Sequence, residues 1–149
     1  MSGSAMKILI LITSSALDKL LALGTIVLGA VSMGHDVAIY ATQSASFAFL
    51  KDYADKISNY SGDPALSGLI NNVVSGYNNA VINGRFFKWY EMIRQAKEIG
   101  SVRVYVCTQP FELAGIKVGL GDFLGIVDEL VMIGKYIELL EWCDKSVSL

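Results

Sequence analysis

Apolar residues along this chain form short continuous runs, separated by segments with helical spacing. Residues 6–13 are almost entirely apolar and have the length of a buried strand, and a second short run covers 37–40. Between them, residues 16–33 distribute apolar side chains around a helix that Gly34 ends. Two strands joined by a long helix predict a right-handed βαβ unit, and therefore a parallel sheet.

The same alternation continues to the end of the chain. We predict a helix at 42–53, an amphipathic helix at 86–99, a strand at 102–107, a short helix at 110–116, a strand at 127–133, a helix at 134–143 and a short strand at 146–149. Five strands alternating with helices predict one doubly wound α/β domain with a five-stranded, mainly parallel sheet flanked by helices. We assign residues 6–149 to this domain and 1–5 to a short vector-derived leader before a native Met6.

One segment, 59–84, breaks the alternation. It is rich in asparagine and glycine, and it carries no charge from Pro64 to Gly84. Solvated loops normally carry charge, whereas this segment mixes leucine, valine and isoleucine with amides. We therefore expect either an inserted lid or subunit contact, or an irregular crossover with one short helix, and the pattern leaves both open.

Composition favours a well-buried core. The chain has 149 residues, enough for one domain, and 53% of them are hydrophobic against 17% charged. Such a surplus indicates buried parallel strands, an oligomer interface, or both. The apolar run 20–35 is interrupted by glycines and is shorter than the roughly 20 residues of a membrane-spanning helix, so we expect a buried helix there.

Charge and cysteine content exclude several classes of function. Twelve Lys and Arg against 14 Asp and Glu, with no basic block, argue against a nucleic-acid partner. Two cysteines and one histidine make neither a tetrahedral zinc site nor a disulfide framework, so we expect no metal and a reducing cytoplasm. Without a GxGxxG motif or a P-loop, we expect no nucleotide cofactor.

The clearest chemical feature is Cys107. It ends the predicted strand 102–107 and is followed at once by Thr108, Gln109 and Pro110. Proline favours the first turn of a helix, so the thiol should lie at the positive end of a helix dipole, which favours the thiolate. A thiolate is a nucleophile and can carry sulfur. We therefore name Cys107 as the catalytic residue.

Other candidates surround this thiol or follow other strands. Ligands of open α/β sheets bind beyond the carboxyl ends of the strands. As supporting residues we name those next to Cys107 and those at corresponding strand ends, which are Thr108, Gln109, Glu112, Ser14, Ser15 and Gly134.

Cys143 and His35 are given smaller roles. Acidic residues beside Cys143 disfavour a thiolate, so we expect a structural cysteine, with a resolving thiol as the alternative. His35 falls in a helix-to-strand turn at the amino end of the second strand. We expect a solvated turn residue there, on the wrong edge of the sheet to act as a base.

The chain resembles the DsrE/DsrF-like superfamily, and within it the peroxiredoxin-like DsrE branch. The matching features are Asp18-Lys19 at the head of a long helix, the turn 30–37, the cysteine run 106–116 and the motif Gly134-Lys135-Tyr136-Ile137-Glu138. After its cysteine this branch usually has a serine- and methionine-rich segment, where this chain has Thr-Gln-Pro-Phe-Glu-Leu. The resemblance implies five parallel strands, homo- or hetero-oligomers, and intracellular sulfur trafficking on a cysteine persulfide or thiosulfonate. Only Cys107 falls on the sulfur-carrying position.

We therefore expect an intracellular sulfur carrier or sulfurtransferase. Its partners would be a sulfane sulfur donor, an acceptor thiol or small sulfur-carrier protein, and further copies of the chain. Two alternatives stay open. One is a peroxiredoxin-like thiol oxidoreductase, and the other is a non-catalytic oligomeric subunit whose uncharged segment and apolar surface serve assembly or peripheral membrane contact.

Overall fold

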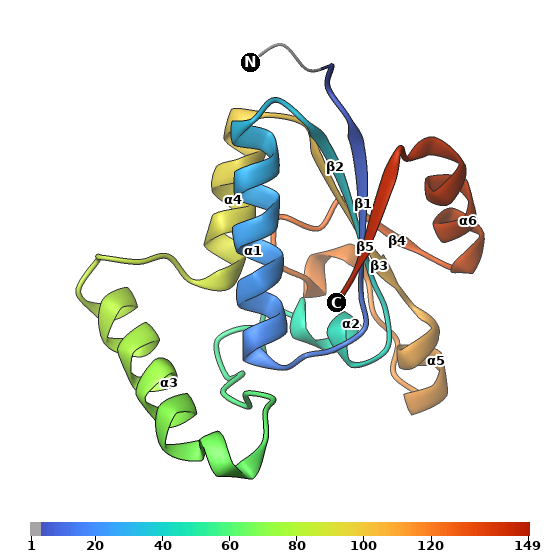
Figure 1. Ribbon diagram of the computed structural model, residues 1–149. Coiled ribbons are helices and arrows are strands. Elements are labelled where there is room, and N and C mark those ends of the chain that lie inside the picture. Colours follow the sequence, from blue (N-terminus) through green and yellow to red (C-terminus); the bar gives the residue numbers. More distant parts are fainter. Residues whose placement is uncertain (1–3) are drawn as a thin grey trace.

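Five parallel strands form the centre of the computed structural model, which describes residues 4–149 (Figure 1). The strands are β1 (Lys7–Ile12), β2 (Asp36–Ala41), β3 (Val102–Cys107), β4 (Glu129–Val131) and β5 (Lys145–Ser148), in the sheet order β4-β3-β2-β1-β5. Every pairing between them is parallel. The predicted α/β class with a five-stranded sheet is confirmed. Residues 1–3 of the predicted leader lie outside the described residues.

Helices cover both faces of this sheet. They are α1 (Leu17–Ser32), α2 (Ser44–Ala48), α3 (Ser67–Ile82), α4 (Trp89–Ile99), α5 (Gln109–Ala114) and α6 (Ile133–Trp142), with short 3-10 turns η1 (Pro64–Leu66) and η2 (Leu120–Asp122). In Figure 1, α1 and α4 lie side by side on one face and α6 lies on the other. Among residues 4–149, no helix is both long enough and apolar enough to cross a membrane.

Several predicted elements are shorter than their sequence patterns indicate, and the helix predicted at 86–99 begins only at Trp89. Two cases have a clear cause. The helix predicted at 42–53 ends at Ala48, because the Phe49 carbonyl accepts a hydrogen bond from the N–H of Leu124 and the next residue bridges to Phe123. The strand predicted at 127–133 keeps only three residues in β4. The Asp128 carboxylate accepts a hydrogen bond from the N–H of Val104 in front of the strand, and Ile133 already begins α6.

Side-chain alternation along β3 decides which face the cysteine occupies. Val102, Val104 and Val106 point into the large core beneath α1 and α4. Tyr105 and Cys107 point the other way, into a smaller cluster that includes Leu139 of α6. Since successive strand residues face opposite sides, Cys107 must lie on the α6 face of the sheet.

Helices α1 and α4 pack closely against each other at Gly24 of α1. A Cβ atom added at Gly24 would lie 2.7 Å from the carbonyl oxygen of Trp89 and 2.7 Å from the Met92 Cε. Contacts this short do not occur at real Cβ atoms, and the carbonyl belongs to backbone that cannot rotate away. Gly24 therefore sets the distance between the two helices. Gly29, in the same helix, has nothing within 4 Å of the equivalent position.

Gly24→Ala should destabilise the protein by about 1–3 kcal/mol, because the added methyl group forces the two helices apart. Gly29→Ala is the matched control and should stabilise by roughly 0.5–1 kcal/mol, since alanine is the better helix former and meets no neighbour. Urea unfolding of both variants measures the difference. A Gly24→Ala protein as stable as Gly29→Ala would show that the helices can separate freely.

The uncharged segment contains a full-length helix. α3 spans 16 residues and projects from the α1 and α4 side of the molecule, as Figure 1 shows. No residue of α3 is buried by the described part of the chain, although the Tyr77 hydroxyl accepts a hydrogen bond of 3.0 Å from the N–H of Trp89. The segment thus differs from an irregular crossover with one short helix.

Candidate functional site

A cavity of about 310 Å³ opens at the carboxyl ends of the strands, beside Cys107. It lies between the sheet and the first turn of α6, the place where open α/β sheets bind ligands. Its walls are formed by Leu11, Tyr40, Thr42, Gln43, Cys107, Gln109, Met132, Ile133 and Tyr136. None of these side chains carries a charge. We call this space the thiol cavity.

The backbone at Cys107 is held in place by neighbouring elements. Cys107 is the last residue of β3, pairs with Val131 and is 3% exposed. The fully buried Ser46 hydroxyl of α2 donates a 2.9 Å hydrogen bond to the Cys107 carbonyl. On the other side, the N–H of Thr108 donates to the Val131 carbonyl. The thiol therefore projects into the cavity from a backbone fixed on both sides.

The Tyr40 hydroxyl is the most unusual polar group in the cavity. Its side chain is buried, and its oxygen finds no hydrogen-bond partner anywhere in the described part of the chain. Burial raises the pKa of this hydroxyl far above its ordinary value, and the adjacent Cys107 thiol raises it further. The hydroxyl therefore keeps its proton. A buried polar group without a partner costs about 1–3 kcal/mol. The Cys107 sulfur beside it is the acceptor that this O–H can reach, although the structure shows no hydrogen bond of good geometry between them.

Two helices begin at the thiol cavity. α5 starts at Gln109, with Pro110 in its first turn as the sequence predicts, and α6 starts at Ile133. Their unpaired N–H groups place partial positive charge near Cys107. α5 has only six residues. The ten-residue α6, whose role was not predicted from the sequence, adds its own partial positive charge at the cavity.

Gln43 occupies a strained backbone conformation on the cavity wall. It has φ 54° and ψ −138°, and it is the only non-glycine residue from 4 to 149 with a positive φ. Such a conformation costs about 1–3 kcal/mol in a non-glycine residue and is found preferentially at functional sites. Gln43 lies between the end of β2 and the start of α2, and in this conformation its side chain lines the cavity.

The structure brings only part of the predicted site together. Cys107 and Gln109 line the cavity, and the Thr108 hydroxyl donates to the sulfur of Met132 at its border. The remaining candidates lie outside the lining. Glu112 is exposed on α5, Gly134 is exposed on α6, the Ser14 hydroxyl accepts from the N–H of Ala16, and the N–H of Ser15 donates to the Ser44 hydroxyl.

Besides Cys107 and Gln109, seven lining residues were not named as site candidates from the sequence, and those with the clearest roles here are Tyr40, Gln43, Met132, Ile133 and Tyr136. One signal pointed to the first of them. Tyr40 is the only aromatic residue in β2, close to its carboxyl end, and this end meets the end of β3 in a parallel sheet. The others follow strands β2 and β4, but their roles depend on where α2 and α6 begin.

Cys143 lies at the opposite end of the sheet from Cys107. Cys143 precedes β5, whose first residue Lys145 pairs with Ile8 at the start of β1. Cys107 lies one residue beyond the register position of Ile12, at the opposite end of β1. With about 3.3 Å per residue and 4.8 Å per strand, the two cysteines are roughly 25 Å apart. A disulfide requires Cα atoms within about 7 Å. Cys143 therefore cannot pair with Cys107 in the same folded chain.

His35 lies at the amino end of β2, away from Cys107, as predicted. The expectation that it is solvated is wrong. His35 is buried, and its Nδ1 accepts a 3.0 Å hydrogen bond from the N–H of Met6. The histidine thus joins the start of β2 to the chain entering β1.

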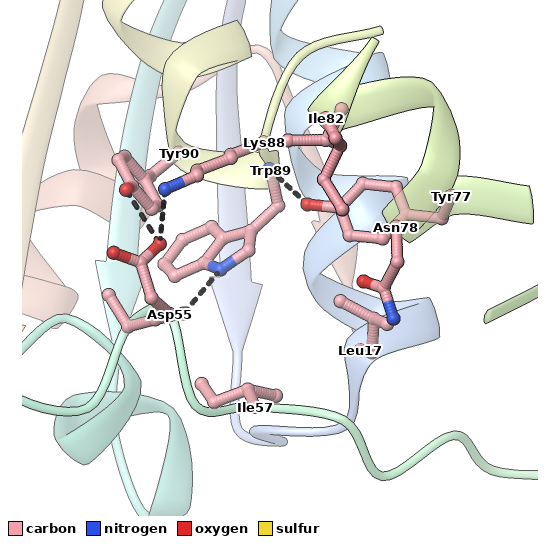
Figure 2. A pocket seen from close by; sticks show the side chains of 11 residues that line it. Leu17, Asp55, Ile57, Tyr77, Asn78, Ile82, Lys88, Trp89 and Tyr90 are labelled. Atoms are coloured by element: carbon pink, nitrogen blue, oxygen red, sulfur yellow. Dashed lines mark hydrogen bonds and ion pairs between the residues drawn. The ribbon is translucent and has the colours of Figure 1, made fainter. Parts of the chain in front are cut away.

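A second cavity, of about 330 Å³, lies between α3, α4 and the segment 54–57 (Figure 2). Its polar groups already pair with one another. Lys88 contacts the Asp55 carboxylate at 2.9 Å, and the Tyr90 hydroxyl donates to the same oxygen at 2.8 Å. Burial alone would raise the pKa of Asp55, but these two hydrogen bonds lower it below its ordinary value. The ionised pair and the tyrosines of this cavity therefore have partners, whereas in the thiol cavity the Tyr40 hydroxyl has none of good geometry.

Within the residues that the structure describes, no group of three or more His, Cys, Asp or Glu side chains could hold a metal ion. No protein-family model and no curated protein matches this chain. The groups at the thiol cavity are therefore the basis for its chemistry. These are a buried thiol, a free tyrosine hydroxyl, two neutral amides and the amino ends of two helices.

Proposed function

We propose that this protein is a sulfur carrier or sulfurtransferase that holds a sulfane sulfur on Cys107 as a persulfide or thiosulfonate. This is the activity that its resemblance to the DsrE/DsrF-like superfamily implies. The observation that carries the proposal is the position of the Cys107 thiol in an uncharged cavity beside the free Tyr40 hydroxyl. Sulfur transfer is attack of a thiolate on a sulfane sulfur, followed by attack of an acceptor thiol on the outer sulfur of the carrier.

The geometry suits a carrier in two respects. A sulfur added to Sγ extends about 2 Å farther, which the cavity has room for. Cys107 is nearly inaccessible to bulk solvent, so an added sulfur is shielded from thiols that do not enter the cavity. Both cysteines are free, which fits the reducing cytoplasm that we propose as the location.

A carrier needs only one thiol, and this favours it over the oxidoreductase. A peroxiredoxin-like cycle would oxidise Cys107 to a sulfenic acid and then require a second thiol to resolve it. Cys143 is at the far end of the sheet, so the resolving thiol would have to come from another molecule.

Assembly into a homo-oligomer stays a prediction, and α3 supports it. Leu69 and Val73 are exposed on this uncharged helix, and Leu66 before it is also exposed. Light scattering at micromolar concentration should show an assembly larger than one chain, and Leu69→Glu should weaken it by placing a charge in the contact. Thr25→Glu, on an exposed position of α1, is the control. A wild-type monomer would contradict the prediction.

Mass spectrometry of the intact protein after exposure to a sulfane donor tests the proposed function. We expect the gain of one sulfur atom or one thiosulfonate group, mapped to the peptide that contains Cys107 and removed by a reducing thiol. An unchanged mass with hydropersulfide, polysulfide, tetrathionate and thiosulfate donors would refute the carrier function. A sulfenic acid formed by peroxide under those conditions would support the oxidoreductase instead.

A further inference from the structure

Resting on the proposed function, we infer that the thiol cavity takes its sulfur from the uncharged hydropersulfide of a small neutral thiol, R–S–SH, and selects against anionic donors such as thiosulfate. The lining of the cavity, the balance of charge around Cys107 and the size of the space favour this class of substrate.

The walls offer no cation to an anionic donor. Apolar side chains and tyrosine rings form most of the lining, and its remaining polar groups are the neutral Thr42, Gln43 and Gln109. The nearest lysine along α6 is Lys135, which is not part of the lining. Its ammonium donates to Glu138 at 3.2 Å and lies 5.0 Å from the centre of the Tyr105 ring. An anion entering the cavity would lose its hydration without gaining an ionic partner, which is unfavourable.

The amino end of α6 is the positive backbone group that faces the site. A Cys107 thiolate formed for the attack would compete with an anionic donor for it. Thiosulfate would bring two further negative charges next to a thiolate. A neutral hydropersulfide adds none, and during the reaction the single charge only moves from Sγ to the departing sulfur.

The free Tyr40 hydroxyl suits this movement of charge. It lies beside the Cys107 thiol, which raises its pKa, and it makes no hydrogen bond of good geometry, so it can donate to sulfur as negative charge shifts between atoms. A volume of about 310 Å³ lies at the lower end of small-molecule pockets, so the R group must be small. Gln43 and Gln109 can hydrogen-bond to a neutral polar group on R.

The transfer step is balanced without an added oxidant or reductant. The Cys107 thiolate attacks the outer sulfur of R–S–SH, a bond forms between Sγ and that sulfur, and the S–S bond of the donor breaks. The donor leaves as R–S⁻ and takes up the proton that Cys107 lost on ionisation. A thiol and a persulfide thus become a persulfide and a thiol, with one sulfane sulfur transferred.

Two matched donors test the inference. Hydroxyethyl hydropersulfide carries no charge on R, and sulfonatoethyl hydropersulfide has the same reactive group with a negative charge on R. We expect Cys107 of the wild-type protein to be loaded at least about tenfold faster by the neutral donor, after each rate is divided by the rate with a free thiol in solution. Thiosulfate should be slower still.

Gln109→Lys should reduce this preference, because it places an ammonium group on an exposed part of the cavity wall. Ile99→Lys adds the same charge at the exposed end of α4 and should leave the preference unchanged. Equal loading by both donors, or a preference unaffected by Gln109→Lys, would overturn the inference and leave the carrier function standing. Failure of every donor to load Cys107 would overturn both.

Discussion

A Cys107→Ser protein should take up no sulfur from a sulfane donor, whereas a Cys143→Ser protein should take up as much as the wild type. Cys107 is the only cysteine at the thiol cavity, and a serine hydroxyl does not form the thiolate that attacks sulfur. Cys143 is roughly 25 Å away, and its sulfur makes a 3.5 Å contact with the Leu140 carbonyl. Intact-mass analysis of the two variants measures the difference.

Peroxide treatment provides the control for this pair of variants. The separation of the two cysteines predicts that peroxide forms no disulfide between them within one chain. A Cys107–Cys143 disulfide in the monomeric fraction, together with unchanged mass after treatment with sulfane donors, would replace the carrier with the oxidoreductase. Thermal unfolding of both serine variants checks that any loss of loading is not a loss of structure.

Trp89→Ala should lower the free energy of unfolding by about 3–5 kcal/mol, as expected for the loss of a buried aromatic side chain. Trp89 is 2% exposed, its ring lies 5.1 Å from that of Phe49 in an edge-on arrangement, and its Nε1 donates to the Ala54 carbonyl. It joins α4 to the segment after α2. Since domains of this size are stable by only about 5–15 kcal/mol, the change is a large share of the total.

Trp142→Ala is the matched control for this prediction. Trp142 is only half-buried, at the end of α6, with the Lys7 ammonium 6.0 Å from its ring. We expect Trp142→Ala to lower the free energy of unfolding much less than Trp89→Ala does, as measured by urea unfolding at the same pH. Equal decreases in the free energy of unfolding for the two variants would mean that the contacts of Trp89 on α4 contribute no more to stability than those of Trp142.

The sheet was predictable because parallel strands buried on both faces are continuous apolar runs. β1 is of this kind from Ile8 onward and β3 from Val104 onward, and the helix between β1 and β2 is long enough for its period to be read. The length of α2 could not be read in this way. It ends where Phe49 meets the chain around Leu124, and no local pattern contains a contact between segments so far apart.

The candidate site was predictable only where it follows a single strand. Cys107 and Gln109 follow β3 directly, so the position of the strand was enough to place them. The hydroxyl of Tyr40 matters because its side chain lies on the same face as Cys107, which requires the register between β2 and β3. His35 was misjudged for a similar reason, since its partner is the backbone of Met6, outside its own turn.

The two faces of the sheet have different consequences for an assembled protein. α3, with its exposed apolar residues, extends from the α1 and α4 side, whereas the Cys107 side chain points toward α6. No residue of α3 lines the thiol cavity. Copies joined through α3 would therefore have their thiols on outward-facing sides, open to separate donors. Loading of one copy should be kinetically independent of loading of the next, giving a non-cooperative dependence on donor concentration.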